Sequence, residues 1–425
     1  MNNNKTVGIL TLGCRVNMYE SCSISERLRE HGYEILKNGK CDYYIVNTCA
    51  VTAESERKSR QLVRRCARNG KVLVIGCASQ LVSDFNDIDN VIYVGGNRNK
   101  MAVVDAIVNY KKSKINAVED MNGAPYENMY LNNGDELFSK CRAFIKIQDG
   151  CNGKCTYCII PKCRGSVRSR DADDIVDEAK KLVANGYKEI ILTGIEVSAY
   201  NKIPLAELIS EVSNINGLER LRLGSLSPNV ITEKFLESVS KSNIFMPHIH
   251  LSLQSCSDKI LQLMKRPYRK KDIFERVDLI RKYLPNVMLS ADIIVGFPNE
   301  SEQDFLETMN ALRELNIYHV HSFPYSERSG TEAATMPNSV PKSVRALRNT
   351  RLIESCSETR KSIFESLIGQ NYKVLVEKIV QGKAFGHTEN FIEACFECKA
   401  CSVGDIIEIL ITSYDNDLIY GDVIN

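Results

Sequence analysis

The sequence predicts an α/β protein built from an amino-terminal doubly wound parallel sheet, a partial (βα)6 barrel and a small all-β barrel at the carboxyl end. Short apolar runs alternate with stretches of helical pattern up to about residue 110, and the alternation resumes at Arg142. From Asn371 onward the chain contains only short strand patterns. A chain of 425 residues is also too long for one typical core, so two or three domains are expected.

The first domain is expected over residues 1–112. Its strand-like runs are 7–12, 43–46, 71–75 and 91–94, with helical stretches at 21–31 and 52–68. The helices are expected to end before Gly32 and before the pair Asn69 and Gly70, because these residue types commonly follow a helix. This order favours a parallel sheet.

The second domain is expected over residues 139–369, after a linker at 113–138 in which the hydrophobic period is lost. Strands are predicted at 143–148, 189–193, 220–224, 248–253, 287–295 and 317–323. Helices are predicted between them, including one at 172–184 and one capped by Ser301 with Asp304 three residues on. Six such units form an incomplete version of the eight-unit barrel, with functional loops at the carboxyl ends of the strands.

The third domain is expected over residues 370–425, with strands at 372–380, 406–412 and 418–423. A short all-strand unit is typical of small barrels that bind oligonucleotides. Cys395, Cys398 and Cys401 lie inside it at a spacing that could hold a metal, although incidental cysteines are the favoured interpretation.

The composition is that of an ordinary soluble protein, with 44% hydrophobic and 25% charged residues. No secretory signal and no membrane-spanning run is present, which indicates a cytoplasmic location. Thiols are kept reduced in that compartment, so the clustered members of the sixteen cysteines are expected to bind metal. The scattered Cys66, Cys141 and Cys356 are expected to be small apolar core residues.

One stretch of the chain is organised around three closely spaced thiols, which we name the loop trio: Cys151, Cys155 and Cys158. Its loop contains Gly150 and Gly153 and ends near Pro161, so the thiols can converge on one soft metal centre. Cys163 supplies a fourth thiol and keeps a zinc site open as an alternative. The spacing differs from paired zinc knuckles, and three thiolates on a four-iron cluster would leave one iron open to a substrate.

Three further cysteines each follow a predicted strand of the first domain, and we name them the strand-end trio: Cys14, Cys49 and Cys77. Carboxyl ends of parallel strands lie along one edge of the sheet, where ligands bind. The spacing alone fits either a second three-thiolate site or three small buried residues.

The loop trio, with Tyr157 before its last cysteine, resembles the signature of radical S-adenosylmethionine enzymes. Its surroundings, from Lys146 to Cys151 and through Pro161 to Arg164 and Gly165, resemble the methylthiotransferase branch of that superfamily. The motifs around the strand-end trio resemble the amino-terminal domain of the same family. The resemblance implies two [4Fe-4S] clusters, one on each trio, and S-adenosylmethionine as cofactor. The small barrel resembles the family's TRAM domain, which binds RNA.

Further motifs at strand ends resemble the family's S-adenosylmethionine-binding segments, and they place the following residues at the cofactor: Tyr157, Gly194, Glu196, Ser225, Gln254, Arg266 and Gly296. Gly194 and Gly296 would permit close backbone approach, and the polar side chains would hydrogen-bond the cofactor. His248 and His250 are expected to be hydrogen-bonded barrel residues rather than bases. Cys256 and Asn299 stand where the family usually has glycine, which puts the geometry of their loops in doubt.

Three basic runs suggest a polyanionic substrate although the net charge is only +2. They lie in residues 57–68, 265–271 and 164–170. The segment from Thr11 to Ser21 is most similar to family members that methylthiolate threonylcarbamoyladenosine at position 37 of tRNA. The implied partners are the tRNA anticodon stem-loop, an electron donor and a sulfur source, with no membrane. Two alternative substrates remain, isopentenyladenosine in tRNA and an aspartate of a ribosomal protein. An alternative of another class is a non-catalytic RNA-binding protein stabilised by its clusters.

Overall fold

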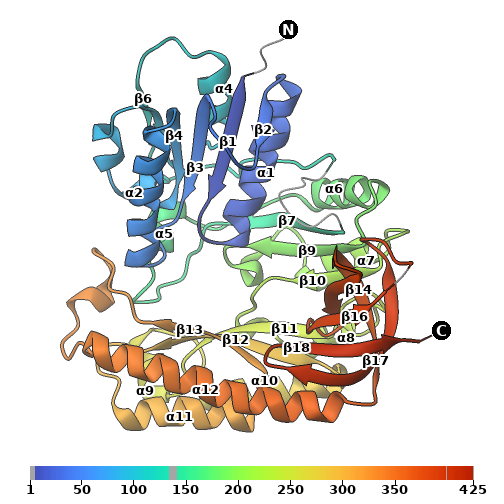
Figure 1. The fold of residues 1–425 in the computed structure, drawn as a ribbon. Helices are drawn as coiled ribbons and strands as arrows, with labels where there is room; N and C mark the ends of the chain where they lie inside the picture. Colours follow the sequence, from blue (N-terminus) through green and yellow to red (C-terminus); the bar gives the residue numbers. More distant parts are fainter. Residues whose placement is uncertain (1–4, 134–140, 399, 425) are drawn as a thin grey trace.

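The computed structural model describes residues 5–133, 141–398 and 400–424. It confirms the predicted fold class, with an α/β amino-terminal part, a partial barrel and a closed small β-barrel (Figure 1). Among the described helices, none combines the length and apolar character that a bilayer crossing requires.

The amino-terminal part is a six-stranded sheet in the order β2-β1-β3-β4-β5-β6, and all neighbouring strands are parallel. Its strands are β1 (Thr6–Thr11), β2 (Glu34–Leu36), β3 (Tyr43–Thr48), β4 (Lys71–Gly76), β5 (Val91–Gly95) and β6 (Ile115–Ala117). Every residue of β3 is buried, because helices cover both faces of this central strand. Strand β2 was not predicted, and β6 lies inside the segment that we predicted as a linker.

The helices of this part are α1 (Arg15–Glu30), α2 (Ala53–Ala67), α3 (Cys77–Leu81) and α4 (Ala102–Val108). Alternate strand residues enter two separate cores, since Ile45 packs in the core that contains α1 and Val46 packs in the core that contains α2. Helix α2 begins at a predicted position, where the Thr52 hydroxyl accepts a hydrogen bond of 3.0 Å from the Ser55 N–H.

The partial barrel contains six parallel strands, as predicted, in two arcs. The strands are β7 (Arg142–Asp149), β9 (Glu189–Gly194), β10 (Arg220–Leu223), β11 (His248–Gln254), β12 (Met288–Val295) and β13 (His319–Pro324), and β8 (Arg168–Ser169) pairs antiparallel with β7. Isolated parallel bridges from Leu221 to Phe245 and from Leu226 to Leu251 join the arcs. The sheet therefore curves without closing.

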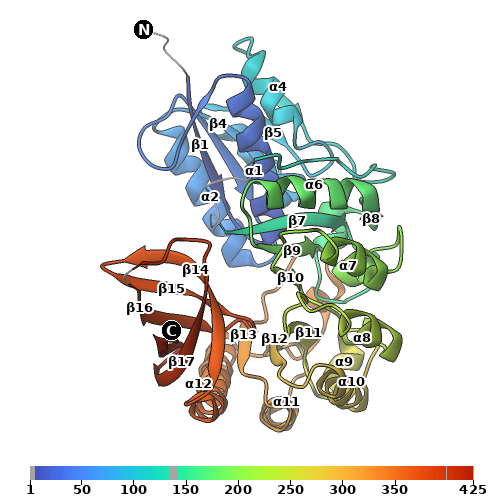
Figure 2. The same cartoon turned by 90° about the vertical axis from the view of Figure 1, so that its right-hand side faces the viewer.

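Helices cover the outside of the barrel (Figure 2). They are α6 (Ala172–Ala184), α7 (Leu205–Ser213), α8 (Glu233–Val239), α9 (Asp258–Leu263), α10 (Lys270–Tyr283), α11 (Glu302–Glu314) and α12 (Lys342–Leu367), whereas the short α5 (Ile160–Arg164) packs against α3 of the amino-terminal part. Ser301 and Asp304 form the predicted cap of α11. Helix α12 runs along the barrel toward the carboxyl-terminal part.

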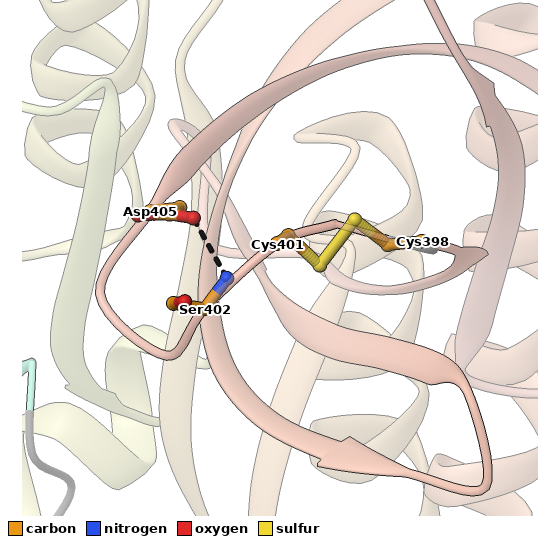
Figure 3. The surroundings of a disulfide bond; sticks show 4 residues. All are labelled: Cys398, Cys401, Ser402 and Asp405. Carbon is orange, nitrogen blue, oxygen red and sulfur yellow. Dashed lines mark hydrogen bonds between the residues drawn. A yellow bond between two sulfur atoms is a disulfide. The ribbon is translucent and has the colours of Figure 1, made fainter.

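The carboxyl-terminal part is a closed five-stranded barrel in the order β14-β15-β16-β18-β17. Its strands are β14 (Asn371–Val380), β15 (Lys383–Thr388), β16 (Glu393–Glu397), β17 (Ile406–Asp415) and β18 (Leu418–Val423). The sequence did not predict β15 and β16. Cys398 and Cys401 form a disulfide in the loop after β16 (Figure 3), while Cys395 is buried within the strand. The interpretation of all three as incidental cysteines is therefore wrong for the disulfide pair.

Buried arginines fix the small barrel against the first ends of β7, β9 and β10. Arg220 donates to the carbonyls of Lys373 and His387 at 2.7 and 2.8 Å. Glu189 accepts from Arg222 Nε at 2.9 Å and also from Arg142. The neighbouring arginines lower the pKa of Glu189 to about 2, although its burial acts in the opposite direction. The contact closes the bottom of the partial barrel and leaves the opposite end for the functional site.

A buried ion network joins the amino-terminal sheet to the barrel. Glu20 of α1 accepts from Lys146 at 2.8 Å and from Arg164 at 2.9 Å, and it also pairs with Lys100. Asp149 accepts from Lys146 at 2.7 Å and from Arg164 at 2.9 Å. All five side chains are at most 5% exposed. These contacts fix α1 to β7 and to α5, the elements that flank the loop trio.

The predicted basic run at 164–170 is wrong as a surface for a polyanion. Arg164 and Arg170 are buried, and Arg170 pairs with Glu178. In the run at 57–68, Arg57 pairs with Glu54 at 2.6 Å and Arg60 pairs with Asp84 at 2.7 Å. Arg64 and Arg68 of this run are exposed, so α2 retains a basic face.

We expect Glu20→Gln to lower the free energy of unfolding at pH 7 by about 3–5 kcal/mol, because it leaves buried cations without a carboxylate. The cations around Glu20 hold its pKa well below the usual value despite its burial. Its contribution is therefore complete above pH ~4.3, the value of an unfolded glutamate, and is lost as the pH falls toward the folded pKa.

Urea unfolding of wild type and variant at pH 7 and at pH ~3.5 measures both effects, and the difference between the proteins should shrink at the lower pH. Glu30→Gln is the control, since Glu30 lies on the same helix but is 45% exposed. Equal stability of wild type and Glu20→Gln at pH 7 would show that the network does not hold the two parts together.

Candidate functional site

The loop trio lies in the connection from β7 to α5, at the carboxyl end of the first barrel strand. The Gly153 N–H donates to Cys151 Sγ at 3.2 Å, and the Arg266 guanidinium donates to Cys155 Sγ at 3.2 Å. A Cβ atom at Gly153 would lie 3.1 Å from Cys151 Sγ and 3.9 Å from Cys155 Sγ, so the glycine leaves room between two converging thiols. Donors aimed at sulfur are typical of iron–sulfur cluster surroundings.

The strand-end trio lies at the carboxyl ends of β1, β3 and β4, as the parallel sheet requires. Gly13 has a φ of 98°, and a Cβ atom there would lie 2.8 Å from Cys49 Sγ, so the close approach needs a glycine. The three thiols influence each other's ionisation, which shows that they are neighbours. Cys14 is exposed, whereas Cys49 and Cys77 are buried, and a shared metal centre on the three stays a prediction.

Cys77 is the thiol of this trio whose surroundings favour the thiolate form. A hydrogen bond from Cys163 and the nearby cations Arg164 and Lys100 lower the pKa of Cys77 to about 5, against the effect of burial. Asn97 Nδ2 lies 3.6 Å from the same sulfur. Burial instead raises the pKa of Cys49 to about 11. A metal group at this site would therefore meet one ready thiolate and would displace protons from the other thiols.

Cys163 belongs beside Cys77 rather than inside the loop trio. Its ionisation is also influenced by Cys158, so it lies between the two trios. Helix α3, which begins at Cys77, packs against α5, which follows the loop trio. Across the described residues, no three His, Cys, Asp or Glu side chains are arranged to hold a single metal ion. The electrostatic influence of Cys77 on Cys163 is larger than that of Cys158, which places Cys163 closer to the strand-end trio than a fourth ligand of the loop trio would be.

A cavity of about 270 Å³ lies beside the loop trio and reaches the segment that follows Cys49, although no cysteine of the strand-end trio lines it. Cys158 and Tyr157 line it from the loop trio, and Val51 and Thr52 line it just after Cys49. The barrel strands contribute the remaining wall, with the polar side chains of Gln254 and Asp292 and the apolar side chains of Ile294 and Phe323. A mainly apolar cavity with few polar groups is typical of a small-molecule site.

Several predicted cofactor residues lie at this end of the barrel. Arg266 contacts Cys155 and also donates to the carbonyl of Ser252 at 3.0 Å. The Glu196 N–H donates to Gln148 Oε1 at 2.8 Å, and burial raises the pKa of the Glu196 carboxyl. Ser225 follows β10 and is half-buried. Their assignment to S-adenosylmethionine stays a prediction.

The predicted glycines face protein atoms. A Cβ atom at Gly194 would lie 3.0 Å from Gln148 Oε1. Gly296 has a φ of 72°, and Arg345 of α12 fills the space in front of it. Both glycines therefore serve close packing of the chain in this structure.

The loops that contain Asn299 and Cys256 have an allowed backbone geometry and hydrogen bonding although glycine is absent. Asn299 adopts a φ of 66°, a left-handed conformation that asparagine tolerates better than most residues, so it can stand where the family has glycine. Cys256 is buried, and its N–H donates to Thr308 Oγ1 at 3.1 Å.

The barrel histidines are hydrogen-bonded, as predicted. His248 and His250 contact Ser290 Oγ at 2.9 and 2.7 Å, and His250 Nε2 lies 3.1 Å from Asp292. Burial lowers the pKa of His248 well below its usual value, which keeps the ring neutral.

Sequence reasoning missed three side chains of the site: Arg15, Asn97 and Asp292. Asn97 follows β5 just as the cysteines follow their strands, so the strand-end rule that found the trio could also have found Asn97. Arg15 and Asp292 gave no comparable signal, because their place near the cavity depends on how the sheet and the barrel meet.

Two family models match the chain. The model described as "Radical SAM superfamily" matches residues 145–312, and the model described as "Uncharacterized protein family UPF0004" matches residues 6–91. The loop trio lies in the first region and the strand-end trio in the second.

Named relatives match over nearly the full chain. A Bacillus subtilis protein named "Threonylcarbamoyladenosine tRNA methylthiotransferase MtaB" is 34% identical over 96% of this chain and 93% of its own length. The Thermotoga maritima protein of the same name is 34% identical over 99% of each chain. An Acetivibrio thermocellus protein named "tRNA-2-methylthio-N(6)-dimethylallyladenosine synthase" is 32% identical over 97% of this chain and 90% of its own length.

Solved structures agree on the fold. The radical S-adenosylmethionine methyltransferase TsrM from Kitasatospora setae matches with a TM-score of 0.58 and 15% identity, covering 78% of this chain and 77% of that chain. The chain thus belongs to the radical S-adenosylmethionine methylthiotransferases, enzymes that transfer sulfur-containing groups, and this membership implies a [4Fe-4S] cluster and S-adenosylmethionine as cofactors.

Proposed function

We propose that this chain is a tRNA methylthiotransferase that converts threonylcarbamoyladenosine at position 37 of tRNA to its 2-methylthio derivative. The observation that carries the proposal is the cavity whose wall includes Cys158 of the loop trio on the barrel and, on the amino-terminal part, the residues that directly follow Cys49 of the strand-end trio. Relatives named for this substrate are 34% identical, and a relative named for dimethylallyladenosine is 32% identical, so the latter substrate class is the second candidate.

In this proposal the loop trio holds one [4Fe-4S] cluster and the strand-end trio holds a second. When bound, the first cluster with S-adenosylmethionine would supply the radical chemistry that removes hydrogen from an unactivated carbon, and the second would carry the sulfur, whose methyl group would come from a further S-adenosylmethionine. Arg266 would offset negative charge at Cys155 and Arg164 would do so at Cys77, where Cys163 and Asn97 also donate hydrogen bonds to the sulfur. The remaining cofactor contacts are proposed at Tyr157, Gly194, Glu196, Ser225, Gln254 and Gly296.

The partners follow from this chemistry. The reaction needs an electron donor and a source of sulfur, and a tRNA substrate fits a cytoplasmic location. We assign tRNA binding to the small barrel, acting as a TRAM domain, and to the basic face of α2. The small barrel exposes Lys373, Lys378 and Lys383 on β14 and β15. The anticodon stem-loop would then span from these surfaces to the cavity.

Iron content separates the two proposed clusters. Anaerobically reconstituted wild type should bind about eight irons per chain, and Cys14→Ala or Cys155→Ala should each reduce this to about four. With dithionite and S-adenosylmethionine, Cys14→Ala should still form 5′-deoxyadenosine, whereas Cys155→Ala should not.

Cys356→Ala is the matched control, because Cys356 is buried outside both trios. Full iron content in Cys14→Ala would exclude the second cluster. Zinc without iron in the wild type would replace both assignments, and wild type that binds iron but forms no 5′-deoxyadenosine would indicate a cluster-stabilised RNA-binding protein.

Substrate choice is tested on tRNA. A strain that lacks the gene should lose 2-methylthio-threonylcarbamoyladenosine and accumulate threonylcarbamoyladenosine, as measured by mass spectrometry of digested tRNA. The purified enzyme should convert an anticodon stem-loop that carries threonylcarbamoyladenosine. Unchanged methylthiolation in the deletion strain would reject this substrate, and loss of methylthiolated isopentenyladenosine would select the second candidate.

A further inference from the structure

Arg15 connects the strand-end trio to the inside of the barrel. It is the first residue of α1 and directly follows Cys14. Its guanidinium carbon lies 5.5 Å from the centre of the Phe144 ring on β7, so its side chain leaves the amino-terminal sheet and enters the barrel. The residue is exposed as a whole, although burial of its guanidinium inside the barrel lowers its pKa.

The positive charge of Arg15 has no close partner in the described part of the chain. No acidic side chain there lies within 4.0 Å of its guanidinium, and the carboxylates whose charges reach it are Asp292 and Glu189. Asp292 lies 3.1 Å from His250, and Glu189 already pairs with Arg142 and Arg222. Both carboxylates therefore have other partners.

Two further arginines lie near Arg15. Arg142 and Arg222 are close enough to disfavour its charge; both pair with Glu189, and Glu377 accepts two hydrogen bonds from Arg142, so the nearby carboxylates are already engaged. His321 faces the same space, and burial lowers its pKa, so it adds a neutral ring rather than a charge. An anion is the ligand that complements such a site.

Arg15 does not line the cavity, but it lies near one of the cavity's walls. Asp292, whose charge reaches Arg15, lines the cavity together with Cys158 of the loop trio. A nucleoside held in this cavity could therefore extend a substituent toward Arg15. Threonylcarbamoyladenosine carries a carboxylate on its threonine moiety, whereas isopentenyladenosine has only a hydrocarbon substituent.

We propose that Arg15 binds the threonine carboxylate of threonylcarbamoyladenosine and so selects this nucleoside over those with uncharged substituents. The inference rests on the proposed function. A guanidinium can donate two parallel hydrogen bonds to a carboxylate, a geometry that an ammonium or an amide does not reproduce.

The test uses the reconstituted holoenzyme and two anticodon stem-loops, one with threonylcarbamoyladenosine and one in which the threonine carboxylate is a methylamide. Wild type should bind the acid about tenfold to a hundredfold more tightly than the amide, measured by fluorescence anisotropy, because a charge-assisted contact is lost. Arg15→Gln should bind both stem-loops with the affinity that wild type has for the amide. Arg15→Lys should recover part of the preference.

Arg27→Gln is the matched control, because Arg27 is an exposed arginine on the same helix. Iron content and the visible absorption spectrum of Arg15→Gln should match wild type, which excludes damage to the cluster beside Cys14. If wild type prefers the acid and Arg15→Gln keeps that preference, the inference is wrong while the proposed function stands. If wild type neither prefers nor converts the threonylcarbamoyl stem-loop, the proposed function itself fails.

Discussion

The architecture depends on the buried ion network between Glu20, Asp149, Lys100, Lys146 and Arg164. It crosses from the amino-terminal sheet to the barrel and contains more cations than carboxylates. Buried ion pairs contribute little net stability compared with apolar packing, but they tolerate only one geometry. The network is therefore best understood as the device that sets where the two parts meet, while the continuous apolar core supplies most of the stability.

The excess positive charge of the network acts on a nearby cysteine. Arg164 and Lys100 both lie near Cys77, whose pKa falls to about 5, so a thiolate supplies the missing negative charge. The same arginine follows the loop trio directly on α5. One set of buried charges thus links the elements that carry the two cysteine trios and lowers the pKa of one thiol. A surface ion pair could do neither, because water would screen its charge.

Much of this arrangement could be predicted from local sequence patterns. Buried parallel strands such as β3 appear as continuous apolar runs, and the parallel order then places Cys14, Cys49 and Cys77 at one edge. Patterns failed where an element is short or half-exposed, as in β2, β6, β15 and β16.

Sequence patterns also failed to predict which charged side chains are buried. Composition assigns Arg164 and Arg170 to the surface, whereas partners more than a hundred residues away in sequence allow Arg164 to be buried. Long-range partners of this kind leave no periodic signal.

The two trios also differ in how much of the chain must fold before their thiols come together. The loop trio spans eight residues and lies on a connection with two glycines, so its thiols can meet after closure of one short loop. The strand-end trio draws on β1, β3 and β4, and its thiols come together only when the parallel sheet has formed. The cavity requires one step more, because its walls come from both parts. The cavity therefore exists only in the assembled chain, in which the Glu20 network joins the two parts that form its walls.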